Sequence, residues 1–152
     1  NIRIPNSNVI DICSGTGALG IEALSRGAKF IYFIDKDPKA IDVLQKNISK
    51  LKIDNKDKTY IKIIKEDALK ALKDIKIVFD IVLIDPPYNS NVIEECLVKL
   101  KQYNLIDFNS YIFAESSKKE NFNYDGFDLL DTKFYGKSKL TVLKLPNSGS
   151  IE

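Results

Sequence analysis

Mostly apolar runs alternate along this chain with stretches in which hydrophobic residues recur at helical spacing. Such runs are typical of buried parallel strands, and amphipathic stretches are typical of the helices that cover them. The predicted strands are Val9 to Cys13, Phe30 to Ile34, Tyr60 to Ile64, Phe79 to Ile84 and Tyr111 to Ala114. The predicted helices are Ala18 to Arg26, one beginning at Pro38, Ala68 to Lys73 and Val92 to Leu100. This alternation predicts a doubly wound α/β fold.

Cap and turn residues agree with these boundaries. Gly27 is placed to end the first helix as a C-cap glycine, and Pro38 suits a first helical turn, where its missing N–H costs nothing. Asp54 to Lys58 reads as a polar loop before the third strand. The helix from Pro38 gathers its apolar residues on one face, namely Ile41, Leu44, Ile48 and Leu51.

The end of the chain is predicted to add a hairpin. From about Phe127 through Lys144 the pattern indicates two strands around a turn at Gly136, and consecutive strands joined so tightly must pair antiparallel. The sum is a mostly parallel seven-stranded sheet with a C-terminal antiparallel hairpin. We expect one domain over residues 1–152, with no boundary before the polar tail at Asn147.

Length and composition agree with this picture. A chain of 152 residues, with 44% hydrophobic and 29% charged residues, is typical of one globular domain. No apolar run approaches the roughly 18 residues of a membrane span, so we expect no membrane association. The chain contains no Met and its first strand begins near Val9, so we also expect that an upstream segment precedes this numbering.

The residue types exclude several chemistries. The chain has no His, which excludes Ser-His-Asp and Cys-His sites and removes the commonest general base. Cys13 and Cys96 lie far apart and form no Cys-x-x-Cys pair, so we expect no metal site. Reduced thiols of this kind indicate a cytoplasmic protein.

The charge balance is weakly informative. The net charge is +2, and this alone does not indicate a nucleic-acid partner. A few lysines near the Tyr88 end of the sheet are the better candidates for phosphate contacts, although the sequence does not say which. The candidates are Lys36, Lys39, Lys118, Lys119, Lys137 and Lys139.

A glycine-rich turn follows the first strand. Gly15 to Gly20 satisfies G-x-G-x-x-G between a strand and a helix, where a ligand can approach the backbone closely. Asp35 follows Gly15 by twenty residues at the end of the second strand, where a carboxylate can accept from two ribose hydroxyls. A nucleoside ligand is therefore expected. At this point a nicotinamide dinucleotide and S-adenosylmethionine fit equally well.

Acidic residues at other strand ends favour the second cofactor. Asp11 lies inside the first strand, and a carboxylate there suits a cationic ligand and would repel a pyrophosphate. Glu66 and Asp67 follow the third strand, where an adenine amine could be bound. Asp67 could equally be an ordinary helix N-cap.

The segment Asp85-Pro86-Pro87-Tyr88 ends the fourth strand, at the sheet edge where open α/β proteins hold their substrates. Methylation of an exocyclic amine needs acceptors around its protons, and the Asp85 carboxylate and the Pro86 carbonyl could supply them. The two prolines restrict the backbone. Tyr88 offers a flat face on which an extruded base could stack, a contact worth roughly 1–3 kcal/mol.

Together these motifs resemble one family. Asp11 to Ala28 is similar almost throughout to the first motif of the RsmD-like family of class I S-adenosylmethionine-dependent methyltransferases, which methylate the guanine N2 amine in 16S ribosomal RNA. Cys13-Ser14 replaces the family's more usual Phe-Ala. The other matching stretches are Asp35-Lys36-Asp37, Glu66-Asp67-Ala68, Asp85 to Tyr88, Glu115 to Glu120 and Tyr135 to Ser138.

The resemblance implies S-adenosylmethionine as the cofactor and ribosomal RNA or the small ribosomal subunit as the partner of a monomeric enzyme. It implies that Asp11, Gly15 and Gly17 hold the methionine portion and that Asp35 holds the ribose. Asp67 and Ala68 would lie at the adenine, and Ser14, Lys36 and Asp85 would also contact the cofactor. Asp85, Pro86, Pro87 and Tyr88 would bind the target amine.

Three alternatives stay open. The Asp-Pro-Pro-Tyr motif also suits an adenine-N6 or other amino methyltransferase acting on DNA or protein. The glycine pattern alone would suit a nicotinamide-dependent oxidoreductase, although Asp11 and the Asp85 motif argue against it. A catalytically dead RNA-binding module is the third alternative.

Overall fold

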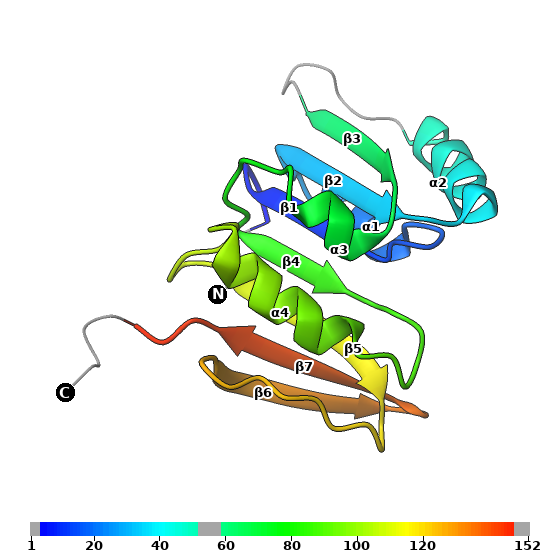
Figure 1. Ribbon diagram of the computed structural model, residues 1–152. Coiled ribbons are helices and arrows are strands. Elements are labelled where there is room, and N and C mark those ends of the chain that lie inside the picture. The colour runs from blue at the N-terminus through cyan, green and yellow to red at the C-terminus, as the bar shows by residue number, and fades with distance from the viewer. Residues whose placement is uncertain (1–3, 52–58, 148–152) are drawn as a thin grey trace.

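One sheet of seven strands organises the computed structural model, which describes residues 4–51 and 59–147 (Figure 1). The strand order is β3-β2-β1-β4-β5-β7-β6. The strands are β1 (Asn8–Ile12), β2 (Phe30–Asp35), β3 (Tyr60–Lys65), β4 (Ile81–Ile84), β5 (Tyr111–Ser117), β6 (Asp128–Tyr135) and β7 (Ser138–Lys144). The helices are α1 (Ala18–Ser25), α2 (Pro38–Ser49), α3 (Ala68–Leu72) and α4 (Val92–Gln102).

The strands from β3 to β5 in the sheet order pair in parallel, and β7 runs in the opposite direction to them while β6 runs in the same direction. β7 pairs antiparallel with both β5 and β6, so the predicted C-terminal hairpin closes one edge of the sheet. In the centre, β1 lies between β2 and β4 with Ile12 level with Ile34 and Ile84. The chain order reverses at β1, so the ends of β1 and β4 form the switch point where such folds bind ligands.

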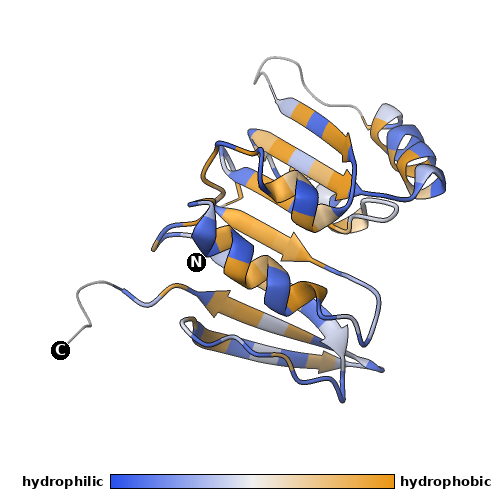
Figure 2. Cartoon of the chain, in the orientation of Figure 1, coloured by the Kyte–Doolittle hydropathy of each residue, from blue (hydrophilic) through white to orange (hydrophobic). Residues whose placement is uncertain are grey.

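Two hydrophobic cores lie on opposite faces of the sheet. Alternate residues of β1 enter different cores, because successive side chains of a strand point to opposite faces: Ile10 packs with α3 and α4, and Val9 packs with α1 and α2. All four residues of β4 are buried, and Figure 2 shows this strand as one unbroken hydrophobic segment. The predicted doubly wound, mostly parallel seven-stranded fold is therefore confirmed.

The structure moves several predicted boundaries. Cys13 lies beyond β1 because its φ of 61° takes the chain out of the extended conformation. Phe79 is fully buried but precedes β4, where its N–H donates to the carbonyl of Leu105. β5 runs to Ser117 rather than ending at Ala114, since pairing with β7 extends it. The predicted loop from Asp54 to Lys58 lies outside the described residues.

Among residues 4–51 and 59–147, no helix is long and apolar enough to cross a membrane.

Candidate functional site

The turn between β1 and α1 depends on its glycines. Gly17 has a φ of 82°, and a Cβ atom at this position would collide with Cδ1 of Leu44 on α2. Gly15 has a φ of 56°, and a Cβ there would meet nothing within 4 Å. Left-handed backbone of this kind favours glycine at both positions. The turn therefore packs tightly against α2 on one side and leaves open space at Gly15 on the other.

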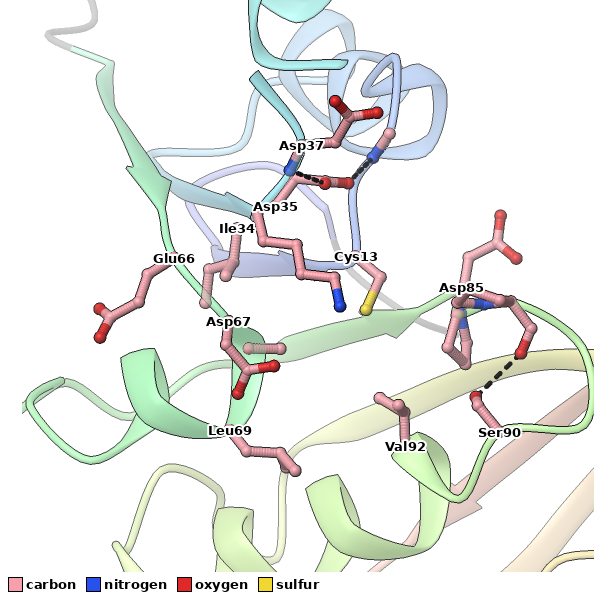
Figure 3. Close-up of a pocket in the computed structure, with 15 residues that line it drawn as sticks. Cys13, Ile34, Asp35, Asp37, Glu66, Asp67, Leu69, Asp85, Ser90 and Val92 are labelled. Carbon is pink, nitrogen blue, oxygen red and sulfur yellow. Dashed lines mark hydrogen bonds between the residues drawn. The ribbon is translucent and has the colours of Figure 1, made fainter. Parts of the chain in front are cut away.

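Asp35 ties this turn to the end of β2. One carboxylate oxygen of Asp35 accepts from the N–H of Gly15 at 2.7 Å, and the other accepts from the N–H of Asp37 at 2.9 Å (Figure 3). A carboxylate oxygen can accept more than one hydrogen bond, so both oxygens keep capacity for a ligand hydroxyl. Asp35 thus fixes the glycine turn and also faces the space beside it.

A cavity of about 540 Å³ opens at the carboxyl ends of β1 to β4. Its volume lies in the range of small-molecule and cofactor sites. Figure 3 shows its lining, contributed by the ends of these strands and by the starts of α3 and α4. The lining residues are Cys13, Gly15, Ile34, Asp35, Lys36, Asp37, Glu66, Asp67, Ala68, Leu69, Asp85, Pro86, Pro87, Ser90 and Val92.

The cavity is acidic at its rim and apolar within its walls. Its apolar side chains include Ile34, Leu69 and Val92, which give a surface for a flat, weakly polar group. Lys36 is the one basic residue of the lining, against five carboxylates: Asp35, Asp37, Glu66, Asp67 and Asp85. An anionic ligand would be repelled by this set, whereas a ligand with a cationic centre and hydroxyl groups would be attracted.

Asp67 caps the helix that follows β3. Its side chain accepts from the N–H of Lys70 at 3.3 Å, and Ala68 is buried beside it at the start of α3. The alternative prediction, that Asp67 is a helix N-cap, is therefore confirmed. Because Asp67 also lines the cavity, the N-cap contact does not remove it from the candidate site.

The Asp85-Pro86-Pro87-Tyr88 segment leaves β4 and is held at several points. The Asp85 N–H donates to the carbonyl of Ile12 at 3.3 Å, and Ser90 Oγ donates to the carbonyl of Pro87 at 2.8 Å. Asn89 adopts a φ of 61°, and its N–H donates to the carboxylate of Glu120 at 2.9 Å. Two prolines and these contacts fix the backbone that faces the cavity.

Asp85 has a second carboxylate beside it. Ile84 is level with Ala114 in the β4–β5 register, so the next residues along, Asp85 and Glu115, lie side by side and share a hydrogen bond. Partial burial, followed by the charge of Glu115 and this hydrogen bond, raises the pKa of Asp85 to about 6. In the sequence, Glu115 belongs only to the stretch Glu115 to Glu120 that resembles the family, and no local pattern indicates that its side chain contacts Asp85.

Asp11 lies beneath the glycine turn rather than at the cavity surface. Its carboxylate is buried and accepts from the N–H of Gly20 at 3.1 Å. Burial raises the pKa of Asp11 to about 7, and the hydrogen bond from Gly20 opposes this rise. A Cβ at Gly20 would lie 2.9 Å from this carboxylate, so the small residue permits the contact. Asp11 thus supports the turn, and its contact with a ligand stays a prediction.

The cavity brings together most of the predicted residues. Gly15, Asp35, Lys36, Asp67, Ala68, Asp85, Pro86 and Pro87 all line it, whereas Asp11, Ser14, Gly17 and Tyr88 do not. Ser14 Oγ is buried without a hydrogen-bond partner among the described residues. Tyr88 is 48% exposed outside the cavity, and its hydroxyl lies 2.6 Å from that of Ser138.

Some lining residues escaped the sequence analysis. Ile34, Leu69, Ser90 and Val92 line the cavity, but their sequence pattern only indicates core or helix positions. Cys13 also lines it, and burial together with nearby carboxylates raises the pKa of its thiol to about 11. The thiol is therefore neutral at ordinary pH, which disfavours a nucleophilic role. The sequence signal that could have placed Cys13 at the cavity was its position at the end of the first predicted strand.

Comparisons with known proteins identify the family to which this chain is similar. The family model described as Conserved hypothetical protein 95 matches residues 1–144. The ribosomal RNA small subunit methyltransferase D of Buchnera aphidicola subsp. Acyrthosiphon pisum is 36% identical over 119 residues, which make up 78% of this chain and 60% of that protein. A candidate rRNA methyltransferase of Bacillus subtilis is 30% identical over 137 residues, covering 89% of this chain and 74% of its own length.

A solved structure gives the same result. A Haemophilus influenzae protein that was crystallised as a candidate methylase matches with a TM-score of 0.81 and 30% identity, over 95% of this chain and 89% of that one. This chain spans less than two thirds of the length of the Buchnera relative.

Proposed function

Since this chain belongs to the RsmD-like family of methyltransferases, we propose that it transfers a methyl group from S-adenosylmethionine to the exocyclic N2 amine of a guanine in 16S ribosomal RNA. The relatives named as ribosomal RNA methyltransferases support the substrate class. A ribosomal substrate would place the activity in the cytoplasm.

The observation that carries the proposal is one cavity with two distinct walls. The Gly15 turn and Asp35 form one wall, and Asp85 with the two prolines forms the other. A nucleoside cofactor bound along the first wall would lie next to a substrate bound against the second. Both walls belong to strand ends around the switch point, where the sheet itself keeps them in fixed relation.

The residues present fit S-adenosylmethionine better than a dinucleotide. The carboxylates of Asp35, Glu66 and Asp67 offer acceptors to ribose hydroxyls and an amine, and the apolar walls suit an adenine ring. A pyrophosphate would meet five carboxylates and one lysine, which is an unfavourable balance of charge. This argues against the nicotinamide-dependent alternative.

When bound, S-adenosylmethionine supplies an electrophilic methyl group on a cationic sulfur. The chain's own residues act on the amine that receives this methyl group. Asp85 and the Pro86 carbonyl accept from the amine protons, which orients the nitrogen lone pair and favours the positive charge that develops on nitrogen. The Asp85 carboxylate, with Glu115 beside it, is also placed to take the proton that the nitrogen releases.

Methyl transfer tests the proposal directly. The full-length protein is given S-adenosylmethionine with a labelled methyl group together with unmodified small ribosomal subunits, naked 16S RNA or DNA, and the labelled nucleoside is identified by mass spectrometry. We expect N2-methylguanosine from a ribosomal sample. Label confined to DNA or protein would support the other amino methyltransferases instead, and cofactor binding without any transfer would support a dead binding module.

A further inference from the structure

The segment Asp85 to Tyr88, here called the catalytic loop, is joined to the β6–β7 hairpin at one edge of the sheet. The Tyr88 hydroxyl lies 2.6 Å from Ser138 Oγ, although fifty residues separate them in the sequence. Ser138 is the first residue of β7 and pairs with Tyr135 of β6 across the turn at Gly136-Lys137. Tyr135 of β6 therefore lies directly opposite Ser138, the residue of β7 whose hydroxyl contacts Tyr88.

Exposed aromatic rings lie beside this turn, with Tyr135 on the same face as Ser138 and Phe134 on the opposite face of the hairpin. Tyr88 is 48% exposed, Tyr135 is 50% exposed and Phe134 is 57% exposed. β6 is the edge strand, and Figure 1 shows no labelled helix beside it. Single exposed apolar residues are common on proteins, but several large rings beside a catalytic loop indicate a contact surface.

Two lysines add positive charge at the same place. The Lys118 N–H donates to the carbonyl of Lys137 at 2.8 Å, which holds the end of β5 against the turn. The Lys118 ammonium also lies 5.8 Å from the centre of the Phe134 ring. Across residues 4–51 and 59–147 the structure shows one ion pair, between Arg26 and Glu22, and neither of these two lysines takes part in it.

Glu120 and Lys139 make contacts within the chain. The Glu120 carboxylate accepts from the N–H groups of Asn89 and Ser117, which holds the loop after Pro87. The Lys139 ammonium donates to the Glu120 carbonyl at 2.6 Å, which anchors this side chain against the segment after β5. Lys118 and Lys137 lie at the turn itself, where the Lys118 N–H donates to the Lys137 carbonyl.

We propose that Lys118, Tyr135, Lys137 and Ser138, here called the turn surface, bind a single-stranded stretch of RNA next to the base held at Tyr88. A nucleotide flanking the target stacks on Tyr135, and the phosphates on either side contact Lys118 and Lys137. This inference rests on the proposed function, because it takes RNA to be the substrate.

The chemistry of the surface favours RNA over a protein partner. Aromatic faces interleaved with lysines suit unpaired bases and their phosphates. A protein strand added to the β6 edge would need a regular row of backbone groups, and the register shift between Leu129 and Asp131 interrupts that row. The turn also lies beside the catalytic loop, because Ser138 contacts Tyr88.

Binding of a labelled RNA tests the proposal without methyl transfer. Fluorescence anisotropy is measured with a single-stranded RNA on the order of 10 nucleotides, over a series of salt concentrations. The test variants are Tyr135→Ala, Tyr135→Phe and the double variant Lys118→Gln with Lys137→Gln. The matched controls are Phe108→Ala, a similarly exposed ring before the first residue of β5, and Lys46→Gln with Lys50→Gln at the end of α2.

We expect Tyr135→Ala to weaken binding about five- to 150-fold, because one stacking contact is lost. Tyr135→Phe should bind like wild type, since the ring is kept. The double lysine variant should lower the slope of log affinity against log salt by about 1.4, at roughly 0.7 for each single-strand phosphate contact. Thermal melting of each variant confirms that it is folded.

Two results would overturn the proposal. Controls that lose as much affinity as the test variants would show that binding is not located at the turn. Variants that bind naked RNA normally but lose methyl transfer to assembled subunits would assign the turn surface to a protein contact. The proposed function can fail separately. If the wild-type protein binds RNA and the variants lose affinity as expected, but no methyl group is transferred, the proposed function is refuted and the RNA-binding role of the turn surface is kept.

Discussion

The two walls of the cavity are built by different means. The glycine-turn wall is held by carboxylates that accept from backbone N–H groups: Asp35 binds Gly15 and Asp37, and Asp11 binds Gly20. The Asp85 wall and the adjoining Tyr88 also depend on contacts between side chains that are farther apart in the sequence, namely Asp85 with Glu115 and Tyr88 with Ser138. The partners at the first wall lie at most twenty residues apart, whereas Tyr88 and Ser138 lie fifty residues apart.

This difference has a functional meaning under the proposed activity. A cofactor is the same molecule in every cycle, so a rigid site with backbone-held acceptors serves it well. A base in RNA must be taken out of its surroundings before it can react, and an exposed aromatic loop suits that step. Under this proposal the first wall binds the cofactor and the Asp85 wall acts on the amine, and variants of each wall can separate the two roles.

Removal of the Asp85 carboxylate should have the largest effect. We expect Asp85→Ala to lower the rate of methyl transfer by about 10²- to 10³-fold, because the amine loses a positioned acceptor. Its cofactor Kd, measured by calorimetry, should stay within about threefold of wild type, since the Asp35 wall is intact. Asp85→Asn keeps an acceptor oxygen and should retain more activity. An equal loss of cofactor affinity and transfer would erase the distinction between the walls.

Asp35→Ala should act on the other wall. We expect the cofactor Kd to rise about 10- to 100-fold, because charged acceptors for the ribose are lost and Gly15 loses its partner. At saturating cofactor the transfer rate should recover most of its value. Asp42→Ala, an exposed carboxylate on α2, is the matched control and should leave the Kd unchanged. A loss of transfer that saturation does not restore would assign Asp35 a part in the chemistry.

The same contrast explains what the sequence could predict. The strand-turn-helix at Gly15 to Gly20 is a local pattern, and the position of Asp35 follows from parallel strands that end at one edge. Gly15 and Asp35 both line the cavity. The mostly parallel seven-stranded sheet and its C-terminal hairpin also followed from periodicity and from the turn at Gly136.

Only part of the second wall could be predicted from the sequence. Asp85 to Pro87 could be placed at a strand end, but the partners of this segment depend on tertiary register. Glu115 reaches Asp85 because β5 extends beyond Ala114, and that extension comes from pairing with β7. Tyr88 reaches Ser138 across fifty residues. Long-range side-chain contacts of this kind leave no local pattern in the sequence, so they could not be predicted from it.

The Asp85–Glu115 contact predicts a pH effect of moderate size. Because the pKa of Asp85 is raised to about 6, the transfer rate should fall about tenfold for each pH unit below that value as the carboxylate becomes protonated. Glu115→Gln removes the neighbouring charge, so the pKa of Asp85 should fall and the acid limb should move to lower pH. An unchanged limb in the variant would show that Asp85 is not the group that titrates.

The last prediction concerns stability and the buried carboxylate of the first wall. Burial raises the pKa of Asp11 in the folded protein from 3.8 to about 7, so the folded state binds the extra proton and the unfolded state does not over this range. The free energy of unfolding therefore gains a contribution as pH falls from 7 towards 4, and the slope is at most about 1.4 kcal/mol per pH unit. Asp11→Asn is neutral at every pH and keeps an acceptor for Gly20.

Urea unfolding at several pH values measures this difference. The free energy of unfolding of Asp11→Asn relative to wild type should rise between pH 4 and pH 7, while Asp42→Asn on the exposed side of α2 should show no such trend. Equal pH dependence in wild type and Asp11→Asn would mean that Asp11 titrates normally. The glycine turn would then rest on an ionised carboxylate, and the first wall would owe its rigidity to a charge-assisted contact with Gly20.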